Sequence, residues 1–147
     1  MKPQVVKVEK IESHPNDERL IIASFLGDFS VVTDMANLNV NDLVGYIPPN
    51  TVVPDNKDFY FLCPRFFEKV EKEGDVKMEP RSPKYSVGEV PEKFRTIKRK
   101  KIRGVYSDGI LHPLPPYKLI EPGRAEVYIF KEGHSVVDVF DLKVKEE

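Results

Sequence analysis

The amino-acid sequence predicts a mostly β fold, built as a small barrel or sandwich. In its first third, four short runs rich in β-branched and aromatic residues follow one another, separated by clusters of turn-forming residues. Short strands at such close spacing are typical of small all-β domains. The length of 147 residues is that of one ordinary domain and suffices to bury a core. We therefore expect a single domain over residues 1–147.

Turn-forming residues mark the ends of the four strands predicted in the first third. They cover residues 5–11, 20–26, 29–33 and 43–47. Residues 13–17 form a turn cluster, and Gly27-Asp28 predicts a tight connection between the second strand and the third. The fourth strand should end at Pro48, because proline cannot continue a sheet ladder.

The middle of the chain has a different character. Residues 58–62 predict a short helical turn, and residues 64–74 predict a helix, since proline stands at its start and glycine at its end. Residues 75–93 are polar and contain three prolines, which predicts a long surface excursion. This excursion has too little apolar content to form a second domain. Together these segments predict a surface insertion at about residues 64–94.

Strand patterns return in the last third of the chain. We expect strands over residues 96–102, 109–111, 127–130 and 136–144, with a proline-rich interruption over residues 113–116. No internal repeat is visible in the sequence. The pattern therefore remains mostly β to its end.

Composition and charge exclude several classes of protein. Hydrophobic residues make up 40% of the sequence and charged residues 32%, and no apolar run approaches the roughly 20 residues that cross a bilayer. We expect neither a membrane span nor a signal peptide, because charges interrupt the N-terminal segment. The lone Cys63 fits a reducing compartment and predicts a cytoplasmic protein. The net charge is −1, so only a local concentration of charge can indicate a polyanionic partner.

Basic residues are concentrated in one such segment. Six of the nine residues from 95 to 103 are basic: Arg95, Lys98, Arg99, Lys100, Lys101 and Arg103. On an extended strand about half of them would share one face, and cations at strand spacing suit a phosphate backbone. Gly104 and Gly109 permit a bend that would present Tyr106 as a stacking group and Ser107 as a hydroxyl donor. This predicts a nucleic-acid-binding site; the alternative is an edge strand whose lysines prevent aggregation.

No pattern in the sequence indicates a catalytic or metal site. His14, His112 and His134 are far apart and have no partner at metal-ligand spacing. Cys63 stands beside hydrophobic residues and is expected to be buried, and neither common phosphate-binding loop is present. We expect no catalytic residue, no metal and no cofactor. Some aromatic residues could form stacking platforms in a barrel groove, but most are expected in the core: Phe25, Phe29, Tyr46, Tyr60 and Phe61.

Two separated motifs resemble known OB-fold domains. Residues 6–20 hold a strand, a His-Pro-Asn turn and a leucine that begins the next strand, and residues 101–110 are Lys-Ile-Arg-Gly-Val-Tyr-Ser-Asp-Gly-Ile. Both resemble the tRNA-binding OB-fold domains appended to some aminoacyl-tRNA synthetases. The N-terminal OB-fold domain of one family of RNA ligases is more similar still, since residues 43–54 and 132–140 also match it. The resemblance implies an OB-fold-like Greek-key barrel with a long insertion and one or two short helices.

Three functions follow from these observations. The first is an RNA-binding module without catalytic activity of its own. The second is the substrate-docking domain of an RNA ligase, because in those ligases the OB-fold domain precedes a nucleotidyltransferase domain containing Lys-x-Asp/Glu-Gly, which this sequence lacks. The third is a protein-interaction module. The expected partners are RNA (single-stranded, structured or nicked duplex) and, for the second function, a ligase catalytic domain.

Overall fold

The computed structural model describes residues 1–145, with only the backbone of Lys72, and the chain is mostly β with two short helices. In chain order the elements are β1 (Gln4–Lys7), β2 (Lys10–Ser13), β3 (Ile21–Phe25), β4 (Phe29–Thr33), β5 (Leu43–Ile47), β6 (Thr51–Val52), the 3-10 helix η1 (Lys57–Leu62), β7 (Arg65–Lys72), β8 (Asp75–Pro83), α1 (Glu92–Arg95), β9 (Lys100–Ile102), β10 (Val105–Ser107), β11 (Ile110–His112), β12 (Tyr117–Glu121), β13 (Arg124–Val127) and β14 (Lys143–Val144). The helical turn predicted at residues 58–62 lies within η1. Among the described residues, no helix has the length and apolar character needed to cross a bilayer.

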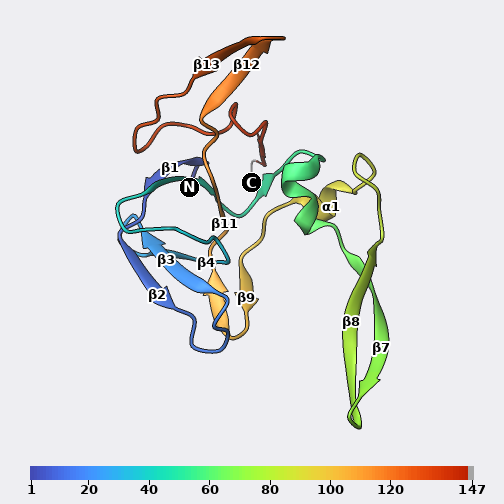
Figure 1. The fold of residues 1–147 in the computed structure, drawn as a ribbon. Coiled ribbons are helices and arrows are strands. Elements are labelled where there is room, and N and C mark those ends of the chain that lie inside the picture. Colours follow the sequence, from blue (N-terminus) through green and yellow to red (C-terminus); the bar gives the residue numbers. More distant parts are fainter. Residues whose placement is uncertain (146–147) are drawn as a thin grey trace.

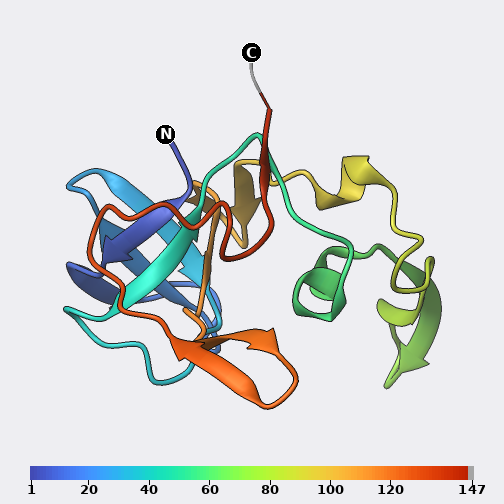
Figure 2. The ribbon, with the colours of Figure 1, turned by 90° about the horizontal axis from the view of Figure 1, so that it is seen from above.

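Two antiparallel three-stranded sheets form the body of the molecule (Figure 1, Figure 2). One has the order β2–β3–β4 and the other the order β1–β5–β11. The first predicted strand is divided between them at Val8 and Glu9. The Val8 N–H donates to the Asp42 carbonyl, while the Glu9 N–H donates to the Ser24 carbonyl. The chain therefore passes from one sheet into the other at this point and joins them.

Strand β5 separates two parts of the hydrophobic core. Val44 and Tyr46 pack on one side in a cluster with Phe25, whereas Ile47 packs on the other side in a cluster with Val5. Tyr46 is fully buried, and its ring centroid lies 4.6 Å from that of Phe25. Because both faces of β5 are covered, its sequence is a nearly continuous apolar run rather than an alternating one.

The buried hydroxyl of Tyr46 makes the stability of the fold sensitive to alkaline pH. It donates a hydrogen bond to the backbone carbonyl of Asp108. Burial, and secondarily the Asp108 carboxylate, raises the pKa of Tyr46 to about 12 from the ordinary value of 10.0. Below pH 10 the tyrosine is protonated in both the folded and the unfolded chain. Above it the unfolded chain loses the proton first, so the free energy of unfolding falls as the pH rises to about 12.

We expect this group to lower the free energy of unfolding by about 2 kcal/mol between pH 10 and pH 12. Urea denaturation at a series of pH values would measure the loss. The variant Tyr46→Phe should lose less stability over the same interval, because it has no proton to release. An equal loss in both proteins would contradict the role assigned to Tyr46.

The helix predicted over residues 64–74 is wrong, because this segment is the strand β7, paired with β8 in an antiparallel hairpin. The two residues that link the strands, Glu73 and Gly74, both have positive φ angles of 52° and 83°. Two such residues form the tight turns of β-hairpins, so Gly74 turns a hairpin and does not end a helix. The hairpin projects from the body (Figure 1). The first half of the predicted polar excursion is accordingly the strand β8.

Two of the strands predicted in the last third, at residues 127–130 and 136–144, are largely wrong, whereas the predicted strand at residues 109–111 overlaps β11. Only Val127 of residues 127–130 lies in a strand, and only the last two of residues 136–144 do. Val136 and Phe140 are buried in the core without strand pairing, and the Phe140 N–H donates to the Val136 carbonyl at 3.1 Å. Both are apolar residues on a turn that packs against the body. A short apolar run in a turn has the same composition as a buried strand, so its pattern does not distinguish the two.

Candidate nucleic-acid interface

The basic segment does not form the single strand that the sequence predicts over residues 96–102. Helix α1 ends at Arg95, Thr96 bridges to β6, and β9 begins only at Lys100. The interruption is caused by Ile97, whose side chain is 3% exposed and belongs to the core. The cations that follow Ile97 are therefore placed by a short extended segment and by the β9–β10 hairpin.

Arg95 is separated from the other cations of the segment. It is half-buried, and its guanidinium donates to the Val90 carbonyl at 3.0 Å and to the Val53 carbonyl at 2.9 Å. These bonds hold the end of α1 against the chain that follows β6. The donors of Arg95 are thus used within the fold, and it does not belong to the exposed group described next.

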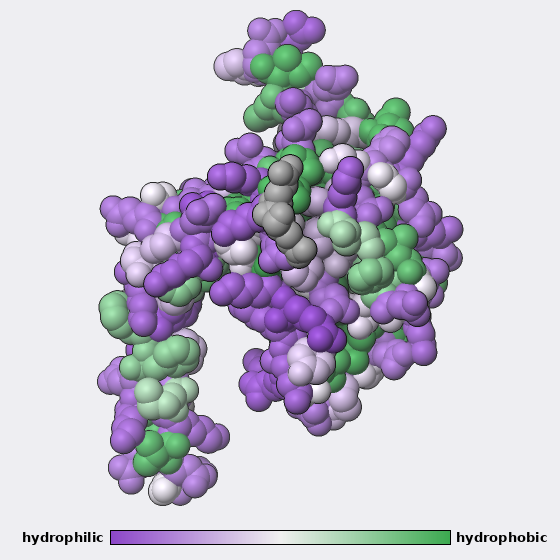
Figure 3. All heavy atoms as spheres, turned by 180° about the vertical axis from the view of Figure 1, so that it is seen from behind, coloured by the Kyte–Doolittle hydropathy of each residue, from purple (hydrophilic) through white to green (hydrophobic). Residues whose placement is uncertain are grey.

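The other five predicted cations are exposed on β9 and its flanks. We name them the basic cluster: Lys98, Arg99, Lys100, Lys101 and Arg103. Figure 3 shows hydrophilic side chains covering the body next to the projecting β7–β8 hairpin. Within residues 1–145, no carboxylate lies at ion-pair distance from Lys98, Lys100 or Lys101. These three charges are therefore available to a polyanion.

Tyr106 lies beside two cations of this cluster. Lys101 pairs with Tyr106 across the β9–β10 hairpin, and its Nζ is 5.6 Å from the ring centroid. The guanidinium carbon of Arg99 is closer, at 4.2 Å, and Arg99 Nε donates to the Asp108 carboxylate at 2.7 Å. The ring itself is 49% exposed. The guanidinium lies over one face of the ring, and guanidinium and aromatic planes are both groups that stack on nucleobases.

Ser107 is not available to a ligand, so the expectation that the bend presents it as a hydroxyl donor is wrong. Its side chain is 2% exposed. The hydroxyl accepts from the Val32 N–H and donates to the Gly109 carbonyl, both at 3.0 Å. Successive residues of a strand point to opposite faces, so the exposure of Tyr106 turns Ser107 inwards. Ser107 therefore ties β10 to β4.

The two motifs that resemble OB-fold domains contact each other in the folded chain. His14 is 5% exposed; its Nδ1 accepts from the Asn16 N–H at 3.0 Å, and its Nε2 lies 2.9 Å from the Ile102 carbonyl oxygen. A ring nitrogen that faces a carbonyl oxygen must carry the proton, which fixes the tautomer. The Asn16 side-chain amide donates to the Arg103 carbonyl at 2.8 Å. The loop after β2 therefore supports the turn of the β9–β10 hairpin.

One carboxylate faces two guanidinium groups at this turn. Oδ2 of Asp17 lies 3.2 Å from Nη2 of Arg19 and 3.2 Å from Nε of Arg103. Hydrogen bonds from Arg19 hold the pKa of Asp17 below its ordinary value, and Arg103 contributes less. The three side chains line one open hollow. Glu18 lines the same hollow, so two arginines face two carboxylates and the formal charges of the lining cancel.

An apolar groove opens on the other face of β9. It has a volume of about 530 Å³ and lies between η1 and the strands β4, β9 and β11. Its lining includes Met35, Phe61, Leu62, Lys100 and Ile102. Lys100 pairs with Ser107 and so points away from Tyr106. It therefore belongs both to the basic cluster and to the groove.

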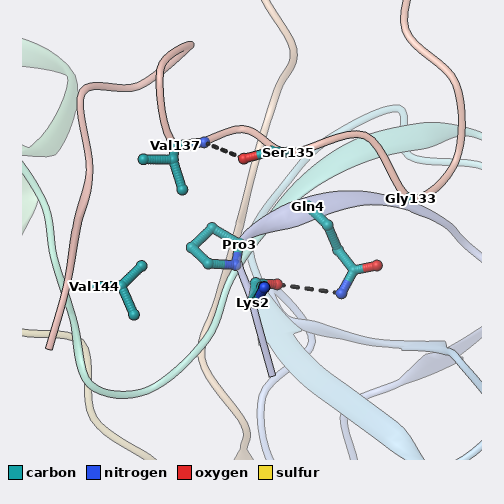
Figure 4. Close-up of a pocket in the computed structure, with 7 residues that line it drawn as sticks. All are labelled: Lys2, Pro3, Gln4, Gly133, Ser135, Val137 and Val144. Atoms are coloured by element: carbon teal, nitrogen blue, oxygen red, sulfur yellow. Dashed lines mark hydrogen bonds between the residues drawn. The ribbon is translucent and has the colours of Figure 1, made fainter. Parts of the chain in front are cut away.

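A separate hollow of about 490 Å³ lies between β1 and the segment after β13 (Figure 4). Lys2 is the one charged residue that lines it within the described part of the chain. Gln4 donates to the Lys2 carbonyl, and the Ser135 hydroxyl accepts from the Val137 N–H, both at 3.2 Å. The polar side chains thus bond to adjacent backbone, and this hollow presents no convergent set of charges to a ligand.

Two parts of the site are not identifiable from residue patterns. The sequence around Asn16 and Asp17 predicts only a turn. Its connection with the site was indicated only by the resemblance of residues 6–20 and 101–110 to OB-fold domains. Phe61, one of the aromatic residues expected mostly in the core, is 64% exposed at the groove. Its neighbour Phe59 is the aromatic side chain of η1 that enters the core.

Comparison with known proteins gives structural neighbours alone. No protein-family model matches the sequence, and no curated protein matches it. The RNA ligase of Naegleria gruberi, in a structure with PPi, matches 99% of this chain with a TM-score of 0.62 and 12% identity, which is 35% of the ligase chain. A mutant of the same ligase with ATP and Mn gives a TM-score of 0.62, 12% identity and coverages of 99% and 36%. An apo mutant of the ligase gives a TM-score of 0.62 and 13% identity, and the match covers 98% of this chain and 35% of the ligase chain.

These values define what the comparison supports. The chain spans about a third of the length of the ligase chains that it matches. At 12–13% identity the likeness concerns the fold. This chain is therefore similar in fold to part of an RNA ligase.

Proposed function

We propose that this chain is an OB-fold-like module that binds RNA and has no catalytic activity of its own. One observation carries the proposal: five exposed cations occur within six residues, around a half-exposed tyrosine, on a hairpin that a second motif supports from below. Cations gain affinity for a nucleic acid because neutralising phosphates releases condensed counterions. Planar groups between them add stacking on bases.

Single-stranded or irregular RNA is the ligand that fits this arrangement best. An A-form duplex hides its major-groove edges, whereas unpaired bases can stack on aromatic rings and on guanidinium planes. Tyr106 and Arg99 supply these two kinds of surface, with the guanidinium over the ring.

The test of this proposal is the salt dependence of binding. Fluorescence anisotropy would measure the affinity for labelled single-stranded RNA, nicked duplex, tRNA and matched DNA at several salt concentrations. With four phosphate contacts, the slope of log K against log salt on single strands should be about −2.8, taking about −0.7 per contact. An affinity that does not change with salt would contradict the proposal. The preferred ligand would distinguish a tRNA binder from a module that docks at nicks.

A second candidate function is docking within an RNA ligase, and the β12–β13 hairpin favours it. The register places Tyr117 opposite Val127 and Leu119 opposite Ala125, so all four side chains share one face. The three larger ones are 52%, 73% and 68% exposed, in the order Tyr117, Val127 and Leu119. Apolar faces of this kind are typical of interfaces. We propose that a ligase catalytic domain, in the same or another chain, would cover this face.

The gene provides the test of this second function. If the reading frame, or a neighbouring one, encodes Lys-x-Asp/Glu-Gly and its product binds this chain, the docking function is supported. Binding should then weaken in Leu119→Lys, which places a charge on the apolar face, and stay unchanged in Lys118→Ala on the opposite face. If neither substitution changes the binding of the catalytic domain, the hairpin is not the docking surface.

A further inference from the structure

The groove beside η1 exposes an aromatic side chain that the fold itself holds in place. The Asn56 side chain caps η1 by accepting from the N–H groups of Asp58 at 3.1 Å and Phe59 at 3.3 Å. Phe59 is 3% exposed and anchors the helix in the core. Phe61, two residues later, is 64% exposed and lines the groove. An anchored helix therefore presents a phenyl ring to solvent at a fixed position.

A second ring lines the same groove. His112 on β11 also lines the groove, and its ring centroid is 5.0 Å from that of Phe59. The centroid of Phe61 is 6.4 Å from that of Phe59 on the helix. The lining of the groove also includes the apolar side chains of Leu62 and Ile110. A flat, largely apolar group is the shape that such a lining can cover with water excluded.

The charges around the groove indicate which kind of flat group enters it. Lys100 lines the groove, and Lys98 lines the small hollow next to it. Two cations of the basic cluster therefore lie at this side of the groove. Asp34 and Asp58 also line the groove. Carboxylates repel a phosphate but accept hydrogen bonds from the N–H groups of a nucleobase. The phosphates are therefore favoured outside the groove, on the lysines, and the base inside it.

We infer that the groove binds one unstacked nucleobase of an RNA strand whose phosphates lie along the basic cluster, with the base ring against Phe61. This inference rests on the proposed RNA binding and adds a specific subsite to it. The subsite lies on the face of β9 opposite Tyr106, with Lys100 reaching it from the cluster. A strand bound there crosses β9 and contacts both of its faces.

The first experiment uses the fact that the chain contains no tryptophan. The variant Phe61→Trp introduces a unique fluorophore at the groove, and a stacked base should quench its emission. Titration with single-stranded RNA should quench it at the concentrations at which anisotropy detects binding. The matched control is Phe67→Trp on β7, at a position that is 61% exposed and lies outside the groove, and its emission should not change. Inorganic polyphosphate, which has no bases, should bind without quenching.

The second experiment measures affinity with Phe61→Ala. Loss of one base–aromatic stack should weaken RNA binding about 10-fold, while the salt slope stays the same because no phosphate contact is lost. An RNA with an abasic site at the docked position should show no further loss with this variant. Unchanged affinity in Phe61→Ala, with salt-dependent binding intact, would overturn the groove inference and leave the proposed function standing. Absence of salt-dependent binding in the wild type would overturn both.

Discussion

Replacing Lys98, Arg99, Lys100 and Lys101 together by alanine is expected to weaken binding to single-stranded RNA on the order of 10³-fold at about 50 mM salt. Four phosphate contacts at about −0.7 each give this factor when affinity is extrapolated from 1 M salt, where counterion release no longer contributes. The salt slope should fall towards zero in the same variant. Anisotropy titrations of both proteins at several salt concentrations would measure the two quantities.

A matched variant separates the site from general attraction between charges. Lys69/Lys77/Lys118/Lys143→Ala removes the same number of charges from exposed positions outside the basic cluster. Both variants therefore have the same net charge. Both should unfold at wild-type temperatures, because exposed lysines and surface ion pairs such as Arg99–Asp108 contribute little to stability. The matched variant should bind within about threefold of the wild type. Equal weakening in the two variants would show that RNA has no preferred site at β9.

The second large effect is expected at Gly109, where substitution by alanine should destabilise the fold by about 4 kcal/mol or more. Gly109 has a φ of +111°, and a Cβ there would lie 2.4 Å from the Ile47 carbonyl oxygen and 3.1 Å from Cα of Pro48. Both are backbone atoms and cannot rotate away. Because the bend carries Asp108, whose carbonyl accepts from Tyr46, the strain also reaches the core. Urea denaturation would measure the loss.

Gly88 provides the control for this substitution. It also has a positive φ, +95°, but a Cβ there would meet nothing within 4 Å. Gly88→Ala should therefore show the backbone strain alone, about 1–2 kcal/mol. If Gly109→Ala were no more destabilising than Gly88→Ala, the close packing of the bend against β5 would be wrong.

The parts of the fold that were predictable are those in which local pattern and tertiary packing agree. The hairpin β3–β4 has alternating residues around Gly27, whose φ of +80° suits a tight turn, and β5 is an apolar run that is buried on both faces. The hairpin β7–β8 was not predicted, because a proline and a glycine at helix-like spacing concealed the turn at Glu73 and Gly74. The conformation of the two turn residues, and not the helix-like spacing, determines the structure of this segment.

The site was predictable in its charges and not in its geometry. The concentration of cations is visible in the sequence, but the loss of Arg95 from the group depends on where α1 ends and on two backbone carbonyls that meet its guanidinium. Ser107 is buried because Tyr106 is exposed. Which of the two faces of this hairpin is buried depends on the part of the fold against which the hairpin packs. The contact of Asn16 with Arg103 joins residues 87 apart in sequence. No local pattern encodes such a distance.

The most direct test of the RNA-binding interface is a titration of the ¹⁵N-labelled chain with a short single-stranded RNA, followed in ¹H–¹⁵N correlation spectra. The account predicts the largest shifts for Arg99, Lys101 and Tyr106, with smaller ones at Asn16 because it supports the same turn. Amides of the β7–β8 hairpin should not move. Shifts confined to the β7–β8 and β12–β13 hairpins, or no shifts at concentrations well above those used in anisotropy, would contradict the claim that β9 and its flanks bind RNA.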